Sequence, residues 1–100
     1  QGWPAAFIVW QTVADESELH LIATAPESRR LGLAAALMQC WFEAAAAQSV
    51  RRLLLEVRAA NLPAQTLHRR HGFTECGRPR DYYSLPDGTR EDAVLMEKPC

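Results

Sequence analysis

The sequence has few cysteines, no long apolar run and almost no net charge, and each shortage excludes a class of protein. Cys40, Cys76 and Cys100 are far apart, which fits neither a disulfide framework nor a zinc site and favours the reducing cytoplasm. No apolar run approaches the roughly 20 residues that span a bilayer, so we expect neither a membrane segment nor a signal peptide. A net charge of -1 gives no electrostatic reason to bind nucleic acid or a membrane surface.

The composition is that of a small globular domain. Apolar residues make up 48% of the 100 residues and charged residues 23%, and we expect one domain over residues 1–100. No repeat or linker divides the sequence. The first residue is Gln1 and not methionine, so we expect a fragment, or a chain whose beginning was removed.

The order of apolar patterns predicts strand, strand, helix, strand, helix, strand, strand. A loop at 81–90 is indicated by the turn signal Pro86-Asp87-Gly88. Trp41 is expected in the core, and His20 on the surface of a strand. The strands are expected at 5–13, 18–25, 51–57, 73–80 and 91–97, and the helices at about 30–49 and 61–71, the second capped by Asn61 with Pro63 in its first turn.

A short basic loop with one glycine joins the second strand to the first helix. Pro26 cannot sit inside a helix, so the helix is expected to start after it, with Glu27-Ser28 supplying the cap. Arg29 and Arg30 add positive charge where the first helical N–H groups have no partner, and Gly32 permits close approach to the backbone. This combination favours a phosphate or pyrophosphate site. The alternative is an ordinary helix start with two solvated arginines.

Four short motifs follow one another along the chain. They are the loop pattern Arg29-x-x-Gly32-x-Ala34, the segment Leu55-Glu56-Val57-Arg58-Ala59-Ala60-Asn61, the segment Leu67-His68-Arg69-Arg70-His71-Gly72-Phe73, and Asp81-Tyr82-Tyr83 followed by Asp87-Gly88 and Arg90-Glu91-Asp92-Ala93. Together they resemble the GCN5-related N-acetyltransferases (GNAT), and most closely the branch of ribosomal-protein-alanine N-acetyltransferases. The resemblance covers nearly the whole chain from about residue 5.

The resemblance implies an α+β fold, the GNAT acyl-CoA N-acyltransferase fold, in which helices flank a central mixed sheet. It also implies transfer of the acetyl group of acetyl-CoA, as co-substrate, to the α-amine of a protein or peptide N-terminus, such as that of a ribosomal protein. Members normally carry one more strand and two helices before the point where this chain begins. Without them the chain would expose apolar surface, which favours pairing with another chain, as in a homodimer.

The resemblance also assigns roles to individual residues. The strand backbone at 22–24 would pair with the pantetheine arm, the loop at 29–35 would bind the pyrophosphate, and Asn61 would bind the cofactor arm. Glu56 would be the general base, and Tyr82 and Tyr83 would line the acceptor site. The residues implied to bind the cofactor are Ile22, Ala23, Thr24, Arg29, Arg30, Leu31, Gly32, Leu33, Ala34, Ala35, Asn61 and His68.

The chemistry of Glu56 supports its role as a base independently of the resemblance. An α-amino group has a pKa of roughly 8 and must lose a proton before it attacks a thioester. A carboxylate at the end of a central strand can take that proton, directly or through water. A charge among Leu54, Leu55 and Val57 is unusual for a buried strand. The alternative is a carboxylate at the rim of the sheet, paired with Arg58.

His68 stands where the family has a tyrosine that acts as general acid for the departing thiolate of CoA. At an unperturbed pKa near 6.5, about a quarter of the imidazole is cationic at pH 7, and the neutral form could still donate one hydrogen bond to the sulfur. The alternatives are a helix-surface histidine with an unassisted thiolate, or Tyr82 or Tyr83 as the acid. His71 lies three residues further on, but no third ligand accompanies the pair, so no metal is expected.

Other functions stay open on the sequence. The same fold could acetylate a small-molecule amine, or it could be a non-catalytic module that binds acyl-CoA or a partner. His68 in place of tyrosine and the short beginning favour the second of these. The arginine pairs could suggest nucleic-acid binding, but the net charge argues against it.

Overall fold

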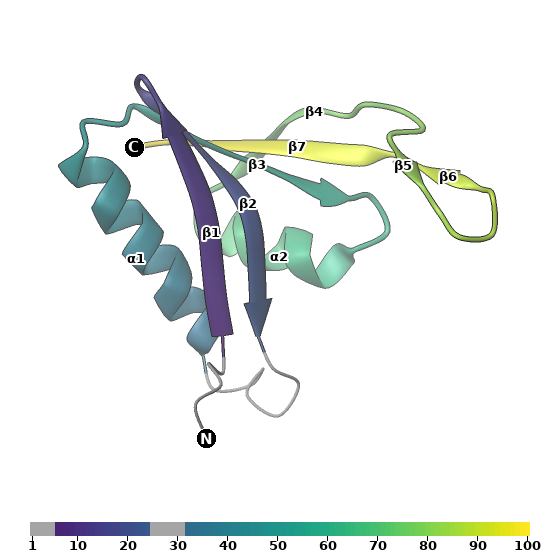
Figure 1. Ribbon diagram of the computed structural model, residues 1–100, viewed down its shortest axis with the longest axis horizontal. Helices are drawn as coiled ribbons and strands as arrows, with labels where there is room; N and C mark the ends of the chain where they lie inside the picture. The colour runs from purple at the N-terminus through teal and green to yellow at the C-terminus, as the bar shows by residue number, and fades with distance from the viewer. Residues whose placement is uncertain (1–5, 25–31) are drawn as a thin grey trace. The chain divides into compact units, whose positions relative to one another are not determined.

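A computed structural model describes residues 6–24 and 32–100 of the chain (Figure 1). The chain divides into two compact units. One contains the described residues up to Leu53 together with Cys100, and the other contains Leu54–Pro99. The strand β3 (Arg52–Arg58) begins in the first unit and contributes its last five residues to the second.

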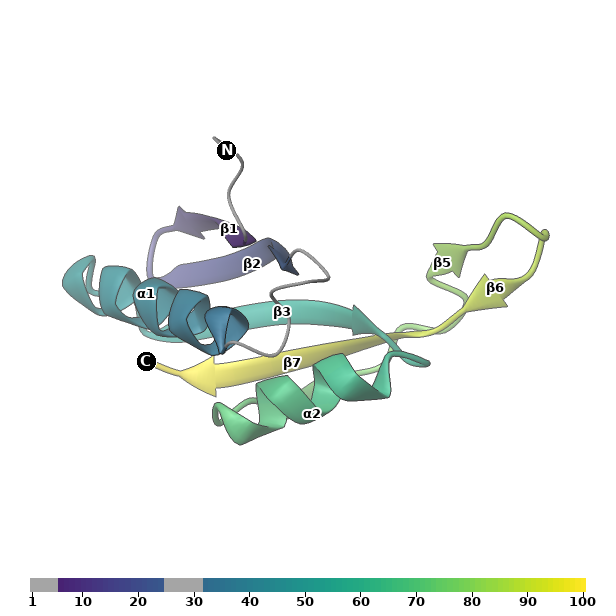
Figure 2. The same ribbon diagram turned by 90° about the horizontal axis from the view of Figure 1, so that it is seen from below.

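The first unit is a β-hairpin with a helix on one face (Figures 1 and 2). The strands β1 (Ala6–Val13) and β2 (Glu16–Thr24) pair antiparallel, with an irregularity in register between Val9 and Trp10. Helix α1 (Leu33–Ala47) buries Trp41 completely, as expected from the sequence. Trp41 Nε1 donates a 2.9 Å hydrogen bond to Oγ of Ser17 on β2, and Ser17 is also fully buried.

One face of this hairpin carries exposed apolar side chains, because the alternation of β1 directs every second residue away from the helix. Phe7, Val9 and Val13 on β1 are exposed, and so is Leu21 on β2. His20 is exposed on β2, as predicted.

The second unit places β7 (Ala93–Pro99) between β3 and β4 (Thr74–Gly77), with β4 antiparallel to β7. Helix α2 (Leu62–Arg70) lies along one face of these strands (Figure 2). A separate short hairpin, β5 (Tyr83–Ser84) with β6 (Arg90–Glu91), precedes β7. The buried side chains of this unit include Leu55, Val57, Phe73, Ala93, Val94 and Met96.

The second helix has the ends that the sequence predicts. Asn61 is its N-cap and accepts a 3.2 Å hydrogen bond from Ala64 N, with Pro63 in the first turn. Beyond its end, Gly72 has a φ of +94°, a backbone conformation that favours glycine. A Cβ at this position would lie 3.3 Å from Lys98 Cε, so the position is restricted by space as well.

Several boundaries differ from the predicted ones; β2, for example, begins at Glu16 and not at residue 18. Helix α1 begins at Leu33 and not near residue 30, and its N-cap is Gly32 rather than Glu27-Ser28, because Gly32 has a left-handed φ of +74° that a helix cannot continue through. The strand predicted at 73–80 is only four residues long. The loop predicted at 81–90 contains β5 and the first residue of β6, since two-residue strands leave no periodicity to detect.

Candidate active site

Glu56 lies on the half-buried face of β3. The strand alternates, so Leu53, Leu55 and Val57 are buried while Glu56 is only partly covered. A carboxylate on this face can exchange protons with a bound molecule without the cost of full burial. The alternative that Glu56 pairs with Arg58 is not what the structure has, because the Arg58 guanidinium pairs with Glu91.

Tyr83 is the hydrogen-bond partner of Glu56. Its hydroxyl donates to Glu56 Oε1 at 3.3 Å. Burial, followed by the nearby Glu56 carboxylate, raises the pKa of Tyr83 to about 12, so the hydroxyl keeps its proton at neutral pH. The ring of Tyr82 meets that of Tyr83 edge-on, with 5.1 Å between centroids, and Tyr82 is 51% exposed. The structure therefore brings the predicted base and the two predicted acceptor-site tyrosines together.

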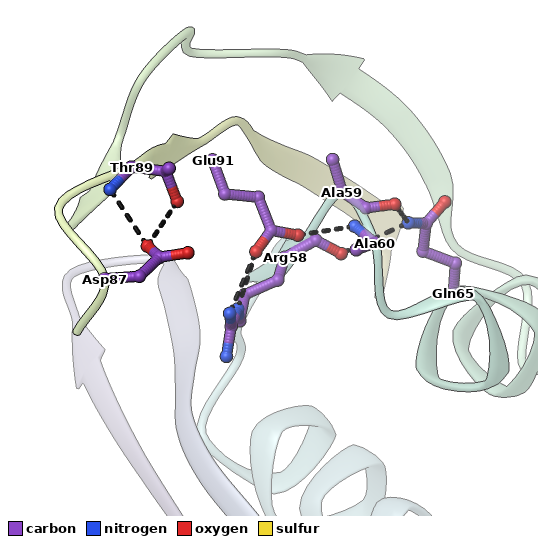
Figure 3. Close-up of polar contacts among 7 residues, drawn as sticks. All are labelled: Arg58, Ala59, Ala60, Gln65, Asp87, Thr89 and Glu91. Carbon is purple, nitrogen blue, oxygen red and sulfur yellow. Dashed lines mark hydrogen bonds and ion pairs between the residues drawn. The ribbon is translucent and has the colours of Figure 1, made fainter. Parts of the chain in front are cut away.

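An ion pair holds the end of β3 to the β5–β6 hairpin (Figure 3). Arg58 Nε donates to Glu91 Oε1 at 3.0 Å, and Arg58 Nη2 lies 2.9 Å from the same oxygen. The other carboxylate oxygen of Glu91 accepts from Ala60 N at 2.6 Å. On the opposite side of this turn, Gln65 Nε2 donates to the carbonyl oxygens of Ala59 (2.9 Å) and Arg58 (3.3 Å). The turn after β3 is thus fixed by side chains from β6 and α2.

The segment that leads into the tyrosines is held by hydrogen bonds to Asp92 and Ala93. Asp81 N donates to Asp92 Oδ1 at 2.9 Å, and Ala93 N donates to the carbonyl oxygen of Pro79 at 2.9 Å. Asp81 has a φ of +52°, which a short polar side chain tolerates better than most. These bonds fix the backbone just before β5, and therefore the position of Tyr83, the first residue of that strand.

His68 is buried on α2, only 4% exposed, which excludes the alternative of a helix-surface residue. Burial, with a smaller contribution from His71, lowers the pKa of His68 from 6.5 to about 4. The expectation that a quarter of this imidazole is cationic at pH 7 is therefore wrong. Its Nδ1 has no hydrogen-bond partner among the residues that the structure describes, and its ring meets Phe73 edge-on at 6.0 Å.

The predicted cofactor residues belong to several elements. Ile22, Ala23 and Thr24 end β2 and pair with Ile8, Phe7 and Ala6 of β1. Leu33, Ala34 and Ala35 form the first turn of α1. They follow Gly32, where an added Cβ would meet nothing within 4 Å. Asn61 uses its Oδ1 to cap α2. Arg29, Arg30 and Leu31 lie outside the described residues.

Sequence reasoning did not assign a role to Glu91 or Gln65. The two residues act on a turn that lies 31 and 6 residues away along the chain. Glu91 belongs to the fourth motif, which could have marked it as a residue of the site. Its pairing with Arg58 could not be predicted, because local periodicity does not reveal a pair between distant charged residues. Gln65 gave no signal.

Within residues 6–24 and 32–100, no three His, Cys, Asp or Glu side chains are grouped so that they could hold a metal ion. In the same segments, neither helix has the length and apolar character needed to cross a membrane.

Comparison with known proteins identifies relatives over nearly the whole chain. The model of the acetyltransferase (GNAT) family matches residues 2–73. The chain is 42% identical over 98 residues to the ribosomal protein bS18-alanine N-acetyltransferase of Escherichia coli (strain K12), a match that covers 98% of this chain and 66% of that protein. The protein of the same name from Haemophilus ducreyi is 37% identical over 91 residues, which cover 91% of this chain and 63% of the relative.

Solved structures agree with these matches. The crystal structure of the ribosomal-protein-S18-alanine N-acetyltransferase from Escherichia coli superposes with a TM-score of 0.88 at 42% identity, over 95% of this chain and 61% of that one. Nourseothricin acetyltransferase superposes with a TM-score of 0.87 at 36% identity, over 96% and 58%. The predicted family and its mixed-sheet fold are confirmed, and the chain spans about two thirds of the length of the curated relatives that it matches.

Proposed function

The chain belongs to the acetyltransferase (GNAT) family, and from this premise we propose that it moves the acetyl group of acetyl-CoA to the α-amine of a protein N-terminus. The observation that carries the proposal is the 42% identity, over 98% of the chain, to a protein named for the alanine of ribosomal protein bS18. An N-terminal alanine of a ribosomal protein in the cytoplasm is accordingly the first acceptor to test.

The proposed reaction is direct attack assisted by Glu56. The carboxylate takes a proton from the ammonium form of the substrate, which has a pKa of roughly 8. The amine nitrogen then forms a bond to the thioester carbonyl carbon, the C–S bond breaks, and the electron pair leaves with the sulfur of CoA. The nitrogen gives up its second proton to solvent as the amide forms, and the thiolate takes up a proton to become the thiol of free CoA. The half-buried face of β3 supports this role, because it leaves Glu56 accessible to an amine.

For the departing sulfur we propose a neutral His68. An imidazole whose pKa is about 4 is almost entirely uncharged at pH 7, so it can donate an N–H hydrogen bond but cannot act as an imidazolium acid. A thiolate is a good leaving group, and a hydrogen bond is sufficient help.

The cofactor is proposed to be held mainly by backbone groups. The strand residues 22–24 would pair with the pantetheine arm, and residues 29–35 would bind the pyrophosphate through N–H groups at the start of α1. The left-handed Gly32, with open space where a side chain would lie, supports close approach of phosphate oxygens. Asn61 would contact the cofactor arm, and Tyr82 and Tyr83 would line the acceptor site.

The cofactor site can be tested by calorimetry with acetyl-CoA on the Gly32→Trp variant. Gly88→Trp is a matched control, because both glycines have a positive φ and open space around the missing side chain. We expect Gly32→Trp to abolish binding and Gly88→Trp to retain it. Equal binding by both variants would remove the loop from the proposed site.

Turnover tests the reaction. With acetyl-CoA and a peptide that begins with the alanine of bS18, Glu56→Gln is expected to lower kcat by about 100-fold or more. The control is Glu18→Gln, which changes an exposed carboxylate on β2. A second candidate acceptor is a small-molecule amine, favoured by the similarity to nourseothricin acetyltransferase, and nourseothricin belongs in the same assay. Binding of acetyl-CoA without transfer to either acceptor would leave only a non-catalytic module.

A further inference from the structure

Two pairs of side chains join the end of β3 to the β5–β6 hairpin. Glu56 and Arg58 are two residues apart on β3 and therefore project from the same face. Tyr83 and Glu91 are direct cross-strand partners in the hairpin, so they also lie side by side. Tyr83 binds Glu56, and Glu91 binds Arg58. The two neighbouring residues on β3 are thus each bound by one of the two neighbouring residues on the hairpin.

We propose that Tyr83 is a positioning residue for Glu56, and that the Arg58–Glu91 ion pair holds the hairpin where this hydrogen bond can form. The role rests on the proposed function, in which Glu56 is the base. The Tyr83 hydroxyl occupies Glu56 Oε1, which fixes the rotation of the carboxylate and directs Oε2 to the substrate amine.

The surroundings of Tyr83 restrict its ring and keep its hydroxyl protonated, so it can donate a hydrogen bond to Glu56 throughout the reaction. Its ring is half-buried against the edge of Tyr82, which restricts its rotation. Burial and then the Glu56 carboxylate raise the pKa of Tyr83, and the smaller opposing effect of Arg58 does not cancel them, so the phenol stays protonated where amines react. Tyr82 is more exposed and is better placed to meet an acceptor. The adjacent tyrosines therefore have different tasks.

The Arg58–Glu91 ion pair restricts the position of the hairpin relative to the end of β3. Glu91 is only 13% exposed, and both of its carboxylate oxygens are used, one by Arg58 and the other by Ala60 N (Figure 3). Charge-assisted hydrogen bonds of this kind are stronger than neutral ones and more specific in direction. Because Glu91 faces Tyr83 across the hairpin, fixing Glu91 also fixes the position of Tyr83.

A double-mutant cycle tests the role of Tyr83. Tyr83→Phe should lower kcat about tenfold, as expected for a lost hydrogen bond to a charged group, and leave the KM for acetyl-CoA unchanged. In the Glu56→Gln background it should have no further effect. An equal tenfold loss in both backgrounds would show that Tyr83 contacts the acceptor by itself, and would overturn the positioning role alone. Wild-type turnover by Glu56→Gln would overturn the base assignment and the positioning role with it.

A spectroscopic test needs no activity. The chain has two tyrosines, so in the Tyr82→Phe variant the tyrosinate absorbance reports Tyr83 alone. Adding Glu56→Gln should lower the ionisation midpoint from about 12 toward the ordinary value near 10, whereas Glu18→Gln should not move it. Circular dichroism at each pH checks that the chain is folded. An unmoved midpoint in the folded Glu56→Gln variant would exclude the contact and overturn the proposal.

Discussion

Mild acid is expected to destabilise the protein through His68, which is buried as a neutral imidazole. The unfolded chain takes up a proton at this residue near pH 6.5, but the folded chain does so only near pH 4. The folded pKa is depressed, so the contribution of His68 to stability is complete above pH 6.5 and is lost as the pH falls. At about 1.4 kcal/mol per pKa unit, the loss is about 2 kcal/mol at pH 5 and about 3 kcal/mol once the folded form is protonated.

The assay is urea denaturation at pH 7 and pH 5, because most carboxylates remain ionised over this interval. His68→Phe should remove about 2 kcal/mol of the pH-dependent loss, whatever its effect on stability at pH 7. His68→Gln serves as a second variant that keeps a polar group. The control His20→Gln changes an exposed histidine and should retain the wild-type loss. If wild type and both His68 variants lose the same stability between the two pH values, the buried neutral state is refuted.

Three more predictions concern single contacts. Asn61→Ala removes the cap of α2 and should lower the free energy of unfolding by about 1 kcal/mol, measured by urea denaturation; no change would contradict the capping role. Ser17→Ala removes the buried acceptor of Trp41 Nε1 and should cost about 1 to 3 kcal/mol in the same assay, with a shift in tryptophan fluorescence. Glu91→Gln breaks the charge pair with Arg58 and should lower kcat nearly as much as Tyr83→Phe; full activity would show that the hairpin needs no brace.

The sequence predicted those features that depend on neighbouring residues. The Asn61 cap, the core position of Trp41 and the exposed His20 all follow from local pattern, and the structure agrees. The four motifs predicted the family, because their order and spacing are more specific than any one of them. The start of α1 was misplaced because Gly32 takes a left-handed conformation that other residues in the loop did not indicate.

Features that depend on distant residues could not be predicted. His68 is followed by two arginines, so its local pattern resembles a solvated helix face, yet tertiary packing buries it. The partner of Arg58 is 33 residues away, and no periodicity connects it to Glu91. The two-residue strands β5 and β6 are too short to leave an alternating pattern, although they carry Tyr83 and Glu91.

The two turns beside the candidate site differ in how much insertion they should accept. At Ala59-Ala60, both backbone N–H groups and the flanking carbonyl oxygens are bound by Asp92, Glu91 and Gln65, so one added residue would break several bonds at once. At the tip of the β5–β6 hairpin, Asp87 accepts hydrogen bonds from Thr89 (Figure 3), and the backbone of Leu85 bonds to Thr89 and Gly88. A peptide tag or a fluorescent reporter should therefore be inserted at this tip, where it would follow the hairpin without loosening the turn that anchors β3.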